Sequence, residues 1–243
     1  MRRGWPAGRL AARRGAALRF RTGLLSLVVS TLAGCASGPP VPDWALAARG
    51  ASERLVAASL QGPVRVEVLE AERLRRELGR TADPVRVARG ALLVCALQQA
   101  RLDLTDCPAF EALRAEASPA DRAYADYLQG RPVAGADALL PEAHRALARR
   151  LASGPALTAA DLPLLAAIED PLARLLAAAV WMRAGQGHPA VVAMAVDTAS
   201  AQGWSRPLAA WLGAQQRLAE RAGDTDTARR AARRLGLLTG AAR

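Results

Sequence analysis

The chain has 243 residues and a formal net charge of +11, and all 33 of its basic residues are arginines. Its length is sufficient for one domain with a substantial hydrophobic core, or for two small domains. Aromatic residues make up 4% of the chain, whereas alanine and leucine are abundant, and this composition favours helices and argues against a protein built mainly of strands.

The first 34 residues have the three parts of an export signal. Seven arginines and no acidic residue precede an apolar stretch, 23–33, which is shorter than the ~20 residues that a membrane-spanning helix needs. The stretch ends in Leu32-Ala33-Gly34-Cys35, which resembles the lipobox of bacterial lipoproteins. The resemblance implies that residues 1–34 are a signal peptide and that Cys35 becomes the acylated N-terminus, carrying a diacylglyceryl group on its sulfur. The alternative is an unmodified cysteine near an ordinary signal or an uncleaved anchor.

The 209 residues that follow the signal carry 26 basic and 22 acidic residues. Their net charge of +4 gives no reason to expect nucleic acid as a partner. Residues 35–43 have the composition of a short flexible tether, and residues 44–238 form the expected helical domain. In the lipoprotein family the residue after the acylated cysteine influences sorting, and Ala36 favours the outer membrane facing the periplasm.

Apolar periodicity and capping residues predict a succession of helices. Val64, Val66 and Val68 alternate as in a strand, but the helical spacing that follows favours a helix from residue 65. Proline and glycine in 131–136 predict an internal loop and a possible subdomain boundary. Between Asp170 and Gly185 nearly all residues are apolar, which is typical of a buried helix. The predicted helices, counted from cap to stop, are 43–61, 65–79, 83–101, 106–113, 118–130, 140–154, 170–185, 188–203, 205–223 and 224–236.

A short motif recurs in the last third of the chain. Arg183-Ala184-Gly185 reappears 38 residues later as Arg221-Ala222-Gly223, and Ala190 and Ala228 keep the same offset. A helical hairpin with glycine at its turn and alanine early in the next helix resembles the tetratricopeptide repeat, although the period differs from 34 residues. The resemblance covers about 171–238 and implies stacked antiparallel hairpins. An irregular helical bundle is the alternative all-α fold.

Two cysteines remain after Cys35 is assigned to lipid. Cys95 and Cys107 form an even pair in an oxidising compartment, which predicts a disulfide if the chain turns back between them. A metal site built from these cysteines with His144 and His188 is conceivable, but their spacing matches no known pattern. Each histidine is better explained as a structural residue, and we expect no metal or cofactor.

The last predicted helix has a basic stripe formed by Arg229, Arg230, Arg233 and Arg234. A solvated face is the simpler interpretation, and a surface for an anionic lipid or polymer is the alternative. Asp226 is placed four residues before Arg230 and is expected to pair with it.

The sequence contains none of the common catalytic motifs. Two classes of function are therefore considered. The first is a membrane-anchored scaffold or accessory factor that binds a protein partner in the envelope and is not an enzyme. The second is an enzyme acting on envelope polymer, which needs a cleft with converging carboxylates. A shallow concave helix face favours the scaffold, and a deep polar cleft with paired acids favours the enzyme.

Overall fold

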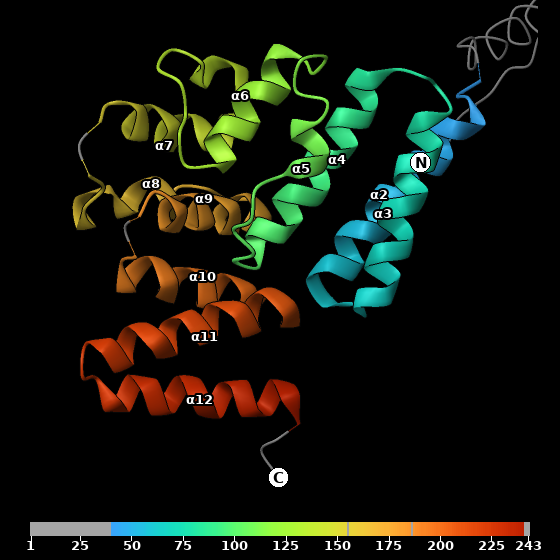
Figure 1. Ribbon diagram of the computed structural model, residues 1–243. Coiled ribbons are helices and arrows are strands. Elements are labelled where there is room, and N and C mark those ends of the chain that lie inside the picture. Colours follow the sequence, from blue (N-terminus) through green and yellow to red (C-terminus); the bar gives the residue numbers. More distant parts are fainter. Residues whose placement is uncertain (1–39, 155, 186, 241–243) are drawn as a thin grey trace, which may run out of the picture. The chain divides into compact units, whose positions relative to one another are not determined.

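The computed structural model describes residues 40–154, 156–185 and 187–240, and the described residues from Pro42 onward form one compact unit. Within these ranges the chain forms eleven α-helices and no strand, which confirms the predicted all-α fold (Figure 1). The export signal, the lipobox and Cys35 lie outside the described residues. The helices are α2 (Asp43–Gln61), α3 (Val64–Gly79), α4 (Pro84–Ala100), α5 (Pro108–Glu111), α6 (Pro119–Leu128), α7 (Glu142–Ala152), α8 (Leu162–Ala166), α9 (Pro171–Arg183), α10 (Pro189–Ala201), α11 (Ser205–Arg221) and α12 (Thr225–Thr239).

Local capping explains where several of these helices begin. Asp83, Ser118, Asp170 and Asp224 each accept a hydrogen bond from a backbone N–H in the first turn of the helix that follows. Such bonds satisfy donors that the helix itself leaves unpaired. These four helix starts were predicted from the sequence and are confirmed.

Other predicted boundaries were wrong. Pro42, rather than Asp43, occupies the cap position of α2, and Asp43 is the first helical residue. The predicted helix 106–113 is reduced to the four residues of α5, which begins after Cys107 without a side-chain cap. The last helix continues past Gly236 to Thr239. A 3₁₀ turn and α8, which connect α7 to α9, were not predicted at all.

The main hydrophobic core is centred on α9. Every residue of α9 from Leu175 to Trp181 is buried, as its nearly continuous apolar sequence predicts. Trp211 of α11 is fully buried and its indole N–H donates to the Ala100 carbonyl at the end of α4, 3.0 Å away. Trp204 is only half-buried. The core therefore joins elements that are far apart in the sequence.

A second, smaller apolar cluster holds α2, α3 and α4 together, and Leu55, Leu74 and Leu97 are its largest members. Leu78 of α3 packs directly over Gly90 of α4. A Cβ at this position would lie 2.6 Å from the Leu78 Cδ1 atom, so the Leu78 side chain would have to shift to accommodate it. The alternating valines at the start of α3 are exposed, so the strand-like pattern there reflects solvent exposure rather than a sheet.

Helices α9 to α12 are neighbours in chain order, with α10 against α9, α11 against α10 and α12 against α11 (Figure 1). Gly185 and Gly223 of the recurring motif both adopt a positive φ, 85° and 71°, at the ends of α9 and α11. The arginines two residues before these glycines have different environments. Arg183 bonds to a loop that is distant in the sequence, whereas Arg221 is exposed. The motif thus marks equivalent turns, but its arginine does not have an equivalent role.

Candidate functional site

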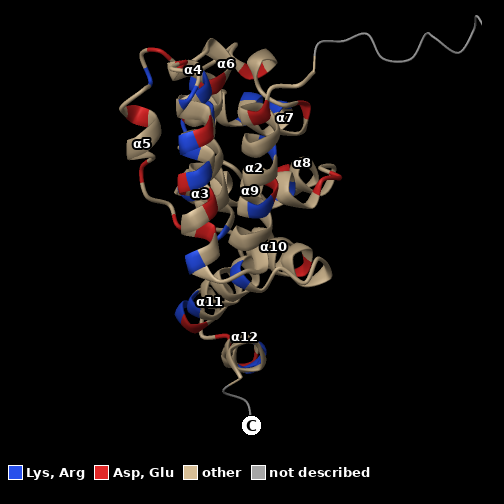
Figure 2. Ribbon diagram, turned by 90° about the vertical axis from the view of Figure 1, so that its right-hand side faces the viewer, with Lys and Arg blue, Asp and Glu red and all other residues tan. Residues whose placement is uncertain are grey.

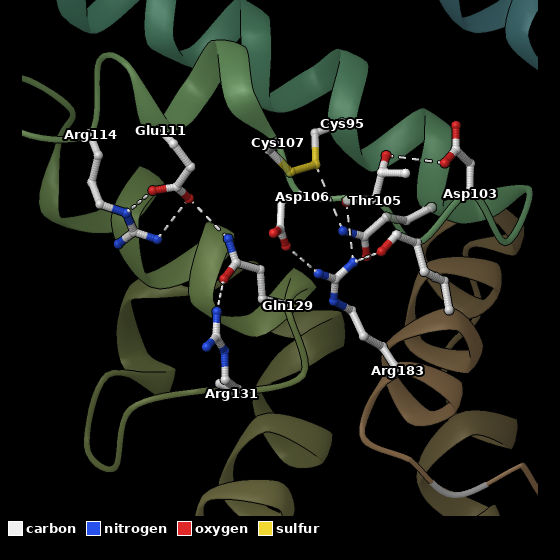
Figure 3. Close-up of a disulfide and its surroundings, with 12 residues drawn as sticks. Cys95, Asp103, Thr105, Asp106, Cys107, Glu111, Arg114, Gln129, Arg131 and Arg183 are labelled. Carbon is white, nitrogen blue, oxygen red and sulfur yellow. Dashed lines mark hydrogen bonds and ion pairs between the residues drawn. A yellow bond between two sulfur atoms is a disulfide. The ribbon is translucent and has the colours of Figure 1, made fainter.

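Cys95 and Cys107 are joined by a disulfide, with their Cα atoms 5.6 Å apart. Cys95 lies within α4 and Cys107 directly precedes α5 (Figure 3). The chain reverses after α4 at Leu102, whose φ of 60° is left-handed, and the Asp103 N–H donates back to the Gln98 carbonyl. Residues 102–106 consequently run back along α4, which brings the second cysteine to the first.

Arg183, at the end of α9, holds the loop that carries Cys107 (Figure 3). Its guanidinium donates to the carbonyls of Leu104 and Thr105 and pairs with the Asp106 carboxylate at 2.8 Å. The Arg183 side chain is 15% exposed, whereas the Asp106 side chain is 78% exposed, so a largely buried arginine here meets a carboxylate at the surface. Asp106 is used here rather than as the helix cap predicted from the sequence.

A chain of polar contacts fixes α5 from the other side (Figure 3). Glu111 accepts from the Arg114 Nε at 2.7 Å and from the Gln129 Nε2 at 2.9 Å, and Gln129 in turn accepts from Arg131. The hydrogen bond from Arg114 lowers the pKa of the Glu111 carboxyl, so Glu111 is ionised at neutral pH. Although α5 has only four residues, the disulfide at Cys107 holds its start and the hydrogen bonds of Glu111 hold its end.

These elements form one wall of an apolar groove of about 430 Å³ between α3, α4 and α5. The volume is within the range of ligand-binding pockets, about 300–1,000 Å³. Its lining is nearly all apolar and includes the disulfide, and the ionised side chains among the sixteen lining residues are Glu72 and Arg75. Acidic and basic residues are mixed along α3 (Figure 2). The two ionised lining residues have opposite charges, so the groove has no single sign of charge. This geometry suits the binding of an apolar group.

The two histidines have structural partners. His144 is 3% exposed, and its Nδ1 lies 3.0 Å from the hydroxyl of the buried Tyr127. Burial lowers the pKa of His144 to about 4, so the ring is neutral at pH 7. His188 caps α10 by accepting from the Ala190 N–H at 3.1 Å. Among the described residues there is no group of three or more potential ligands that could hold a metal ion.

The predicted basic stripe lies on the outer face of α12. Arg229, Arg230 and Arg233 are exposed and Arg234 is half-buried. Arg229 pairs with Asp226 at 3.0 Å, whereas Arg230 donates to the Thr227 hydroxyl. The expected pair between Asp226 and Arg230 was therefore wrong, since the residue three positions after Asp226 is the one that reaches it.

Sequence reasoning missed a buried ionic cluster at Glu67. The Glu67 carboxylate, 8% exposed, accepts from Arg101 at 2.6 Å, from Arg206 and from the Ser59 hydroxyl at 2.8 Å. Burial alone would raise the Glu67 pKa, but these hydrogen bonds outweigh it and lower the pKa. A signal existed in the sequence: Glu67 precedes Ala71 and Leu74 by four and seven residues, on the face of α3 that packs inward.

No helix in the described part of the chain is both long and apolar enough to cross a membrane. Comparisons of the whole chain with models of protein families, with curated proteins and with solved structures find no match.

Proposed function

We propose that this chain is a bacterial envelope lipoprotein, anchored through Cys35 to the outer membrane on its periplasmic side, whose helical domain holds a protein partner. Leu32-Ala33-Gly34-Cys35 supports the anchor. The proposed role is binding rather than catalysis, and it requires no cofactor, metal or nucleic acid.

The groove between α3, α4 and α5 is the observation that carries this proposal. Its apolar lining would bury the apolar face of an amphipathic helix from the partner. Glu72 and Arg75, with opposite charges at its edge, can meet polar groups on the flanks of such a helix. Because the disulfide and the contacts of Arg183 fix the α5 wall in advance, little conformational freedom is lost on binding.

Residues 171–238 would contribute a second contact surface. A smaller hollow of about 360 Å³ lies between α10, α11 and α12 and includes the repeat residues Ala190 and Ala222. The basic stripe of α12 is on the neighbouring outer face. An extended partner contacting both regions would gain affinity from two sites at once.

The test compares two exposed alanines. Ala109 lines the groove, whereas Ala57 is exposed on α2 and lines neither hollow proposed for the partner. We expect Ala109→Glu to prevent crosslinking of a protein partner to a photoreactive amino acid placed at Ala112, because a charge in the groove opposes burial of apolar surface. Ala57→Glu should leave the crosslink unchanged.

Crosslinking is carried out in intact bacteria that produce the full chain, and circular dichroism of each purified variant verifies folding. Equal crosslinking by both variants would show that the groove is not the binding surface. If purified wild-type protein instead degrades envelope polymer, the chain is an enzyme and the proposal of a scaffold fails.

A further inference from the structure

A different hollow, of about 470 Å³, lies between α2, α3 and α4 and combines an apolar floor with an arginine rim. Leu74, Leu78 and Leu93 belong to the floor. Three of the twelve lining residues are arginines and none is acidic. An apolar surface bordered by cations is complementary to a molecule that has both an anionic group and a hydrocarbon part.

The three arginines, Arg49, Arg86 and Arg89, retain donors for a ligand. Each pairs with an acid outside the lining, Glu53, Asp83 and Asp121 respectively, at 3.0, 2.8 and 3.1 Å. The Arg49 and Arg86 side chains are 79 and 49% exposed, so their pairs are surface pairs of small energy. Arg89 is 66% exposed, but it donates to both oxygens of Asp121, whose side chain is 10% exposed. A guanidinium has five N–H donors, and Arg49 and Arg86 use only Nε in the bonds to their acids.

Trp44 fixes one side of this hollow. The guanidinium carbon of Arg86 lies 4.7 Å from the centre of the Trp44 ring, a cation–π contact that holds both side chains in place. Trp44 is the second residue of α2, and it directly follows the predicted tether, 35–43. Under the proposed anchor, this end of the domain is close to the lipid surface, where tryptophan and arginine are favoured.

We infer that this hollow binds an anionic phospholipid of the membrane in which the chain is anchored, with the phosphate at the three arginines and the glycerol and upper acyl carbons on the leucine floor. The inference extends the proposed function, because it relies on the anchor to bring the hollow to the membrane. It gives the domain a preferred face toward the lipid.

The test is native mass spectrometry of the full chain, purified from bacteria in a neutral detergent. Phosphatidylglycerol and phosphatidylcholine with identical acyl chains are added at equal concentrations. Wild-type protein should retain phosphatidylglycerol in preference to phosphatidylcholine. Replacing Arg49, Arg86 and Arg89 with glutamine should weaken retention by roughly fivefold for each arginine removed.

The matched control replaces Arg65, Arg217 and Arg221 with glutamine, which changes the net charge equally at exposed arginines outside this hollow. Thermal melting followed by circular dichroism verifies that both triple variants fold. If the first does not, Arg49→Gln alone serves, since Arg49 and Glu53 are both exposed.

Three outcomes would overturn the inference. They are equal retention of phosphatidylglycerol by the two variants, equal retention of the two lipids by wild type, and complete displacement of phosphatidylglycerol by inorganic phosphate, which would indicate a simple anion site. The same spectra report the mass of the lipid on Cys35. A chain that lacks this mass but still retains phosphatidylglycerol would refute the anchor while leaving the lipid site intact.

Discussion

The buried His144 should make the stability of the domain depend on pH above the range in which carboxylates titrate. Burial lowers its pKa to about 4 in the folded chain, despite the nearby negative charge of Asp170, whereas an unfolded histidine has a pKa near 6.5. Between these values the unfolded chain binds more protons. The free energy of unfolding therefore falls as the pH is lowered through 6.5 toward 4.

The expected loss between pH 8 and pH 5 is about 2 kcal/mol, a substantial part of the ~5–15 kcal/mol that holds a domain together. Urea denaturation followed by circular dichroism at the two pH values measures it. His144→Gln should abolish most of the difference, because glutamine is neutral at both pH values and can still bond to the Tyr127 hydroxyl.

His188→Asn is the matched control, because asparagine also caps helices and the histidine it replaces is at the start of α10 rather than in the core. It should keep the wild-type difference between pH 8 and pH 5. The reasoning fails if wild type and His144→Gln lose the same free energy of unfolding between these pH values.

Three further predictions concern the anchor, the disulfide and the basic stripe. Labelling with an alkyne fatty acid should be lost in Cys35→Ser; persistent labelling and normal cleavage would rule out the lipobox. Alkylation of the unreduced, unfolded chain should detect no free thiol at Cys95 or Cys107, and replacing both with serine should lower the free energy of unfolding by about 3 kcal/mol, the value for closing so short a loop. Two alkylated thiols would disprove the bridge. Reversing Arg229 and Arg233 to glutamate should leave thermal melting nearly unchanged and weaken partner capture most at low salt, where exposed charges are least screened. Unchanged capture at low salt would make the stripe a solvated face.

Most helix starts could be predicted because the signals are local. Ser118, Pro119 and Asp121 are within one turn of each other, and the cap they form depends on nothing further along the chain. The burial of α9 could also be predicted from the sequence, since a helix without a polar face must be covered on all sides. The all-α fold follows from the repetition of such local patterns.

The features that shape the groove could not be predicted from local sequence, because they depend on partners far away in the chain. Asp106 is of a residue type that often caps helices, but its carboxylate pairs with Arg183, 77 residues later. The role of Arg183 was hidden by its membership in the Arg-Ala-Gly motif, which suggested equivalence with Arg221. Periodicity places Glu67 on the inner face of α3, yet it cannot identify Arg101 and Arg206 as the groups that make burial tolerable.

The Glu67 cluster also has a consequence for the order in which the chain acquires its structure. Ribosomes release α2 and α3 first, and these helices can pair as soon as both exist. Arg206 is 139 residues further along, so Glu67 lacks one of its two cations until α11 has been synthesised. Ser59 in α2 and Arg101 at the end of α4 can bond to Glu67 before then, so the carboxylate has one cation while the N-terminal helices pair. Arg206 adds the second cation and ties α3 to α11, so the Glu67 cluster is complete when the C-terminal half has been synthesised.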